Sequence, residues 1–293
     1  MLYTLKNEHL TVTVNDMGAE LWSIVHRGAE YLWQGDSTYW SGHAYNLFPI
    51  CGRLTDGKYT WQGKTYEIGC HGFARKTQYT MIEQTENSLS FRLTDDEKTR
   101  AIYPFAFALT LTYTLEEKTV RTTFHVENKG DEPLPFAVGG HPGFHVPLGG
   151  EGSFDDWRLE FACAKNDLRQ LIFSDTCYLT RNPSVPFPHL VDGKIIPLRH
   201  TLFDNDAFFL ENPCRTVSLR SDKSDRAVTV SFPDMPYLGI WHAPKTEAPY
   251  VCIEPWVGMA DYDGESGDFA TKRDMIKLGA GESYTNAYTI TVA

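Results

Sequence analysis

The chain contains two long stretches in which apolar and polar residues alternate, Phe107-Ala-Leu-Thr-Leu-Thr-Tyr-Thr-Leu115 and Thr119-Val-Arg-Thr-Thr-Phe-His-Val-Glu127. Alternation with a period of two places the apolar side chains on one face of a strand. The two stretches are joined only by Glu116-Glu-Lys118. A short polar connection between two such strands is typical of an antiparallel hairpin. We therefore expect a long hairpin here, with one face buried in a core.

Shorter stretches with the same period recur along the chain. They cover residues 9–14, 20–25, 58–62, 65–68, 88–93, 157–161, 217–220, 227–232, 238–242, 250–254 and 284–292. Residues 58–62 and 65–68 flank Gly63-Lys64, which predicts a second hairpin with glycine first in its turn. No segment has a convincing period of 3.6 residues, so only short helical turns are expected, near residues 38–40 and 98–103.

Many short strands separated by turn signals indicate an all-β sandwich or barrel. No linker rich in Pro, Gly or Ser divides the chain and no internal repeat is visible, so residues 1–293 are predicted to form a single domain. Residues 173–202 differ, because they contain four prolines and little alternation. Since long irregular loops in compact domains are usually functional or disordered, this segment is expected to wrap the sheet and to wall a cleft.

The composition describes a soluble globular protein, with 42% hydrophobic residues, 22% charged residues and a formal net charge of -11. Because no basic cluster is present to neutralise phosphates, a nucleic-acid partner or an anionic membrane is disfavoured. The first residues lead directly into a strand pattern without a signal peptide, and no apolar run is long enough to span a bilayer. We therefore expect a cytoplasmic protein.

The cysteines and histidines lack the spacing of a metal site. The six cysteines form no Cys-x-x-Cys pair, which suggests neither a disulfide framework nor a zinc site. Reduced thiols are expected, with Cys252 as a small core residue. Among the histidines, only His141 and His145 are four residues apart, and they flank a proline and a glycine. No metal is therefore predicted.

Four stretches place polar side chains where the pattern otherwise predicts core or tight turns. They are Asn46-Leu-Phe-Pro-Ile-Cys-Gly-Arg53, Cys70-His-Gly-Phe-Ala-Arg75, Phe136-Ala-Val-Gly-Gly-His-Pro-Gly-Phe144 and Tyr250-Val-Cys-Ile-Glu-Pro-Trp256. In the third stretch, the glycines and Pro142 are expected to interrupt the sheet and to leave His141 at the mouth of a strand. A histidine titrates near neutral pH and can exchange a proton there, although a lone histidine in a turn is more often structural.

Glu254 lies at the end of a strongly apolar strand and precedes Pro255, so partial burial at the strand exit is expected. Burial raises the pKa of a carboxyl group, which is the tuning that a general base near neutral pH needs. The alternative is a structural ion pair, for example with Arg53.

The other polar candidates also admit structural interpretations. His71 stands beside Gly72, which is typical of a turn, so a structural histidine is the alternative. An arginine such as Arg75 is more often a surface or ion-pair residue. Asp204 and Asp206 are typical of residues that cap a strand. The remaining candidates are aromatic residues that either pack in the core or stack on a sugar, namely Trp241 and Trp256.

Taken together, the four stretches resemble the aldose 1-epimerase family, and most of all its LacX-type branch, over essentially the whole chain. The resemblance implies a large antiparallel β-sandwich of the galactose mutarotase-like supersandwich type. It implies that His141 is a general acid and Glu254 a general base, which interconvert the α and β anomers of a hexose such as galactose or glucose. No cofactor is implied, because no electrons move and no group is transferred.

The resemblance also implies residues that bind the substrate. Arg53 and His71 match positions that contact the sugar near its anomeric centre and ring oxygen. Asp206 is the better match for a substrate-binding aspartate, and Asp204 remains the alternative. Trp256 or Trp241 would cover an apolar face of the sugar.

The form His71-Gly-Phe-Ala-Arg75 is shared with a sugar-phosphate branch of the family, which leaves a second activity open. A hexose-6-phosphate 1-epimerase would use Arg75, Lys76 and Arg53 as cations. A non-catalytic carbohydrate-binding or sensing protein on the same fold would not need both His141 and Glu254. A polysaccharide lyase would usually be exported, and nothing in the sequence indicates export. The partner expected in all these cases is a sugar, bound by a monomer or a homodimer.

Overall fold

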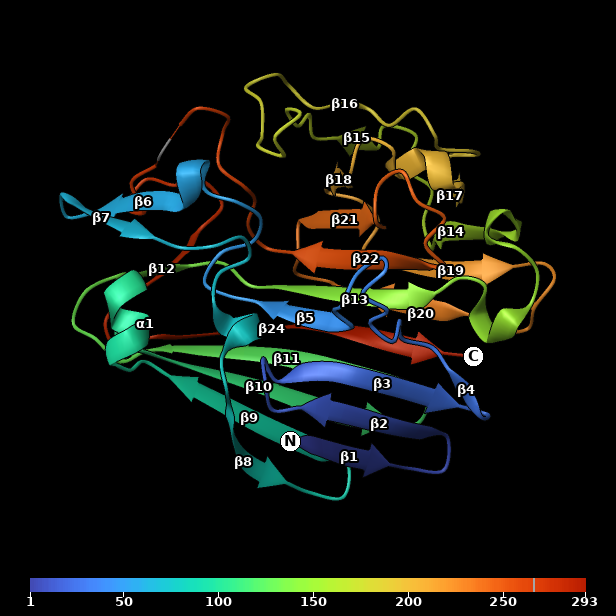
Figure 1. The fold of residues 1–293 in the computed structure, drawn as a ribbon, viewed down its shortest axis with the longest axis horizontal. Coiled ribbons are helices and arrows are strands. Elements are labelled where there is room, and N and C mark those ends of the chain that lie inside the picture. Colours follow the sequence, from blue (N-terminus) through green and yellow to red (C-terminus); the bar gives the residue numbers. More distant parts are fainter. Residues whose placement is uncertain (266) are drawn as a thin grey trace.

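Antiparallel strands are the main elements of the computed structural model, which describes residues 1–265 and 267–293 (Figure 1). The larger of two main sheets has nine strands, in the order β17 (Ile195–Pro197), β14 (Trp157–Phe161), β19 (Thr216–Ser221), β20 (Val228–Ser231), β24 (Ser283–Val292), β11 (Thr119–Asn128), β10 (Phe107–Glu116), β9 (Ser88–Thr94) and β8 (Thr80–Gln84). The second has seven, in the order β16 (Val185–Pro186), β15 (Arg169–Gln170), β18 (Phe208–Glu211), β21 (Tyr237–Trp241), β22 (Tyr250–Trp256), β13 (Gly139–His145) and β5 (Ala44–Leu47).

Smaller elements flank these two sheets. A four-stranded sheet contains β1 (Leu2–Lys6), β2 (Leu10–Asn15), β3 (Glu20–His26) and β4 (Ala29–Glu30), and two-stranded sheets are formed by β6 (Lys58–Trp61) with β7 (Lys64–Glu67) and by β12 (Leu134–Phe136) with β23 (Ile276–Leu278). The helical elements are α1 (Glu97–Ile102) and five 3-10 turns at Thr55–Gly57, Ala74–Lys76, Leu148–Gly150, Phe154–Asp156 and His200–Phe203. Within the described residues, no helix is long and apolar enough to cross a membrane.

The inner faces of the two main sheets share one core. Phe124 and Tyr288 of the nine-stranded sheet belong to the same buried cluster as Ile240 and Ile253 of the seven-stranded sheet. This arrangement confirms the prediction of an all-β sandwich with few short helical turns.

The long hairpin predicted from the alternating stretches is present as β10 and β11. Their register runs from Phe107 opposite Asn128 to Glu116 opposite Thr119. The apolar side chains of β10 are buried at every second position, as the period of two requires.

In the second predicted hairpin, formed by β6 and β7, the turn is shifted by one residue. Its central residues are Gln62 and Gly63, both with positive φ (50° and 76°), as in the primed turns that suit two-residue hairpins.

The prediction that glycines interrupt the sheet before His141 is wrong. Residues Gly139–His145 form β13, which pairs with β5 on one side and with β22 on the other. The glycines instead make room for large side chains on both faces of this strand. A Cβ on Gly139 would lie 2.7 Å from the Trp256 ring, and one on Gly140 would lie 2.6 Å from the Tyr288 ring.

The expectation that all cysteines are reduced is also wrong, because Cys163 and Cys214 form a disulfide. They lie just beyond the last paired residues of β14 and β19, Phe161 and Val217. A pair 51 residues apart in sequence carries no local signal, which is why the spacing did not reveal it. The other four cysteines are free, and Cys252 is buried as predicted.

Replacing Gly140 by Ala is expected to destabilise the protein, because the new methyl group would overlap the ring of Tyr288, which is fully buried. Overpacking of this kind lowers the free energy of unfolding by about 1–3 kcal/mol. Gly69→Ala is the matched control, since a Cβ at Gly69 meets nothing within 4 Å. Urea unfolding followed by circular dichroism measures both variants. Equal midpoints for the two would contradict this account of β13.

Candidate active site

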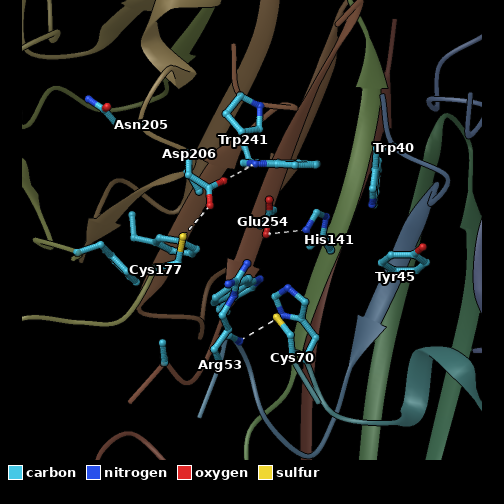
Figure 2. A pocket seen from close by; sticks show the side chains of 18 of the residues that line it. Trp40, Tyr45, Arg53, Cys70, His141, Cys177, Asn205, Asp206, Trp241 and Glu254 are labelled. Carbon is cyan, nitrogen blue, oxygen red and sulfur yellow. Dashed lines mark hydrogen bonds and ion pairs between the residues drawn. The ribbon is translucent and has the colours of Figure 1, made fainter. Parts of the chain in front are cut away.

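A cavity of about 400 Å³ lies on the face of the seven-stranded sheet formed by β5, β13, β22, β21 and β18 (Figure 2). Loops around residues 52–53, 70–75, 173–177 and 205–207 complete its walls. The structure brings together in this cavity every site residue predicted from the sequence. These residues are Arg53, His71, Arg75, His141, Asp206, Glu254 and Trp256.

The register between β13 and β22 sets His141 against Glu254. Gly139 pairs with Trp256 and Gly143 with Cys252, so His141 lies opposite Glu254 on the same face of the sheet. His141 Nε2 is 3.3 Å from Glu254 Oε2. Glu254 is therefore inside β22 rather than at its exit, and its partner is His141 rather than Arg53.

Burial controls the protonation of this pair, whose side chains are only 9% and 2% exposed. Desolvation lowers the pKa of His141 to about 3, and the nearby positive charge of Arg75 acts in the same direction. Desolvation also raises the pKa of Glu254 well above its usual value, helped by the negative charge of Asp206. Both shifts favour the uncharged forms, a carboxylic acid at Glu254 and a neutral imidazole at His141, over a buried ion pair.

Aromatic side chains fix the imidazole of His141 from several sides. The indole of Trp40 stacks on it, with ring centroids 4.9 Å apart and an interplanar angle of 29°. Trp241 and Tyr45 meet it edge-on, at centroid distances of 5.8 and 6.1 Å. These rings restrict the orientation of the imidazole.

His71 lies on a turn whose backbone is left-handed, with φ of 63°. Its Nδ1 accepts a hydrogen bond from the backbone N–H of Gly52 at 3.1 Å, which leaves the proton on Nε2. Burial lowers the pKa of His71 well below its usual value, and the neighbouring His141 acts in the same direction. His71 is therefore a neutral N–H donor whose ring lies 5.5 Å from that of His141.

Two arginines give the cavity a positive side. The guanidinium of Arg75 lies over the ring of Tyr45 at 4.8 Å and donates to the carbonyl of Cys70. The guanidinium of Arg53 hydrogen-bonds the thiol of Cys70 (Figure 2). Among the described residues, neither arginine forms an ion pair with a carboxylate. Both can therefore bind polar or anionic groups of a ligand.

Asp206 is held at the opposite wall by two donors. Its Oδ1 accepts from Trp241 Nε1 at 2.6 Å, and its Oδ2 accepts from the thiol of Cys177 at 2.9 Å (Figure 2). Asp204, the alternative left open by the sequence, is exposed and is not part of the cavity lining. The geometry therefore favours Asp206.

Several lining residues were not predicted from the sequence. They include Trp40, Tyr45, Cys70, Cys177, Asn205 and Phe209. Trp40 lies in a turn in which its backbone N–H donates to the carbonyl of Asp36. The sequence predicts such a turn near residues 38–40. Phe173, Ser174 and Cys177 confirm that the proline-rich region begins with a segment that walls the cleft.

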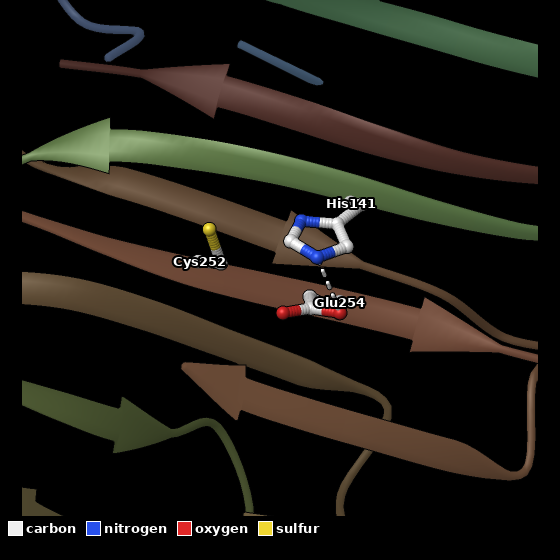
Figure 3. A group of neighbouring side chains, drawn as sticks. All are labelled: His141, Cys252 and Glu254. Carbon is white, nitrogen blue, oxygen red and sulfur yellow. Dashed lines mark ion pairs between the residues drawn. The ribbon is translucent and has the colours of Figure 1, made fainter. Parts of the chain in front are cut away.

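One group of side chains among the described residues combines three possible metal ligands (Figure 3). The ligand atoms of His141, Cys252 and Glu254 all lie within 4.8 Å of one another. Sequence spacing did not reveal this group because it draws on two different strands.

Known proteins match this chain over nearly its whole length. The family model described as Aldose 1-epimerase matches residues 1–291. Protein LacX, chromosomal, from Lactococcus lactis subsp. lactis is 35% identical over 300 residues, which cover 100% of this chain and 99% of the relative. The plasmid-encoded LacX of the same organism matches to the same extent.

Solved structures also match over the full length. A galactose mutarotase related enzyme from Lactobacillus acidophilus has a TM-score of 0.94 and 37% identity, covering 100% of this chain and 97% of that one. A galactose mutarotase-like protein from Lactobacillus casei ATCC 334 has a TM-score of 0.94 and 30% identity, covering 100% of both chains. From the extent of these matches, this chain belongs to the aldose 1-epimerase family.

Proposed function

We propose that the protein is an aldose 1-epimerase that interconverts the α and β anomers of a hexose such as galactose or glucose. The observation that carries this proposal is the buried pair of His141 and Glu254, which lie 3.3 Å apart in a cavity large enough for one sugar ring. The names of the similar solved structures, which refer to galactose mutarotase, support a free hexose as the substrate.

The proposed reaction opens and closes the sugar ring by two coupled proton transfers. The single proton of the pair first moves from Glu254 to His141. Glu254 as carboxylate then takes the proton from the C1 hydroxyl, while protonated His141 gives its proton to the ring oxygen. The C1–O5 bond breaks, and rotation about C1–C2 presents the other face of the aldehyde. For closure the two residues exchange roles. The pair holds one proton before ring opening and one proton after it, so no net charge enters the cavity.

The other lining residues orient the sugar in this proposal. His71 donates from Nε2 to an oxygen near the anomeric centre, and Arg53 steadies the negative charge that develops there. Asp206 accepts from sugar hydroxyls, and the indole of Trp256 covers an apolar face of the ring. The reaction needs no cofactor, because neither electrons nor groups are transferred.

Replacing Glu254 by Gln or His141 by Asn is expected to slow mutarotation by about 10²–10⁴-fold, the usual contribution of one positioned acid or base. Polarimetry of freshly dissolved α-D-galactose and α-D-glucose measures the rate above the spontaneous reaction. Circular dichroism establishes that each variant is folded. A folded variant with the wild-type rate would exclude the assigned roles.

The pH dependence should report the buried pair. Below the pKa of His141, lowered by burial to about 3, both groups are protonated and no base remains. Above the raised pKa of Glu254 both have lost their protons and no acid remains. We therefore expect kcat/KM to be retained as the pH falls through 6.5, the ordinary value for histidine, with losses only beyond the two shifted pKa values. An acidic limb centred near 6.5 would show that His141 titrates as an exposed imidazole.

A second candidate, hexose-6-phosphate 1-epimerase, is favoured by one observation, the two arginines without a carboxylate partner among the described residues. A hydrogen bond between a guanidinium and a phosphate contributes about 1.5–3 kcal/mol. If the substrate is phosphorylated, Arg75→Gln should raise KM for glucose 6-phosphate by roughly 10–100-fold and change KM for glucose much less. Lys76→Gln is the control, because Lys76 is exposed and lies outside the cavity lining. Exchange NMR spectroscopy measures both sugars, and equal effects of Arg75→Gln on the two would reject this candidate.

A further inference from the structure

We propose that His141, Cys252 and Glu254 form a binding site for a thiophilic divalent cation such as Zn²⁺, which inhibits the protein by occupying its acid–base pair. Binding of the ion rests on the three side chains alone. The inhibition rests on the proposed function.

The three ligands converge because of the strand geometry. Cys252 and Glu254 are two residues apart on β22 and therefore point to the same face, and His141 reaches the same point from β13 (Figure 3). Zn²⁺ binds three protein ligands and an open fourth position in tetrahedral sites, with bonds of about 2.0–2.3 Å and hence about 3.3–3.8 Å between ligand atoms. The observed separations are all within 4.8 Å, so small side-chain rotations bring the three atoms to a common ion.

The charge balance of the site suits a divalent cation. A Cys252 thiolate and a Glu254 carboxylate together neutralise two positive charges, and neutral His141 adds a third ligand without charge. Binding releases two protons, one from the Cys252 thiol and one shared by His141 and Glu254. Without an ion, burial raises the pKa of the Cys252 thiol and of the Glu254 carboxyl, which disfavours two neighbouring buried anions. The negative charge of Asp206 favours a cation here, and the positive charge of Arg75 opposes it.

The surroundings leave one side of the site open. Cys252 packs in a buried cluster with Trp33 and Tyr250, away from solvent. His141 and Glu254 face the cavity, so the fourth position points to the space where a sugar would bind. An ion bound here takes the Nε2 lone pair of His141 and the carboxylate of Glu254, which removes both proton-transfer groups at once.

The ligand set also selects the kind of metal. A thiolate and an imidazole favour Zn²⁺ and Cd²⁺, whereas Mg²⁺ and Ca²⁺ prefer oxygen ligands. Mg²⁺ is therefore a matched negative control.

The test titrates the chelator-treated full chain with Zn²⁺ by calorimetry and follows mutarotation in parallel. We expect one ion per chain, release of protons to the buffer, and loss of activity that is reversed by EDTA. Cys252→Ser should keep most of its mutarotation rate and weaken Zn²⁺ binding by more than about 10–100-fold, the effect of losing even an outer partner of a metal ligand. Mg²⁺ should have no effect on either protein.

A second variant separates this site from the cysteines that line the cavity. The double variant Cys70→Ser/Cys177→Ser should bind Zn²⁺ as tightly as the wild type, since neither thiol belongs to the ligand set. Unchanged binding in Cys252→Ser, or lost binding in the double variant, would overturn the proposal.

A spectroscopic measurement keeps the site testable if Cys252→Ser does not fold or if no sugar is turned over. Co²⁺ added to the wild type should give a thiolate-to-cobalt charge-transfer band and the intense visible bands of a four-coordinate site. Absence of the thiolate band would reject the site whatever the outcome for mutarotation. Its presence in a protein without mutarotase activity would leave the metal site standing and remove only the inhibitory role.

Discussion

The site depends on one constraint, the register of β13 against β22. A slip of one residue would turn His141 to the other face of the sheet, into the core that holds Tyr288. The register is fixed by close packing at the glycines, since Trp256 leaves no room for a Cβ at Gly139 and Tyr288 leaves none at Gly140. Gly139 and Gly140 therefore have two effects. They let β13 fit between Trp256 and Tyr288, and they hold the register that places His141 beside Glu254.

Burial gives this pair its chemical character. In water an imidazole and a carboxyl group would separate into an ion pair near neutral pH, but desolvation penalises both charged forms. One proton is left to move across a distance of 3.3 Å. A reaction that takes one proton from a substrate and returns one to it matches such a pair, because the charge of the cavity stays constant throughout.

Sequence patterns predicted the parts of the structure that local chemistry determines. The period of two gave the β10–β11 hairpin and the sandwich, because burial of one face follows directly from alternation. The stretch before His141 was predicted to interrupt the sheet because glycine and proline usually break strands. It forms a strand instead, because the glycines leave the space that the rings of Trp256 and Tyr288 occupy on its two faces. The motifs identified His141 and Glu254 on the sheet and also the loop residues Arg53, His71 and Arg75. Trp40 and Cys177 lie outside these motifs and reach the cavity through a turn and a long loop, whose path no local pattern specifies.

The cavity thus consists of a rigid floor and a wall of loops. The acid–base pair belongs to β13 and β22, in the middle of a hydrogen-bonded sheet. Cys177 and Asp206 belong to the segment between Cys163 and Cys214, which the disulfide closes. Asp206 joins wall to floor, because it accepts hydrogen bonds from Cys177 in the wall and from Trp241 at the end of β21. Changes in the wall can therefore alter which sugar is held, while the strands keep His141 and Glu254 in place for the same proton transfer.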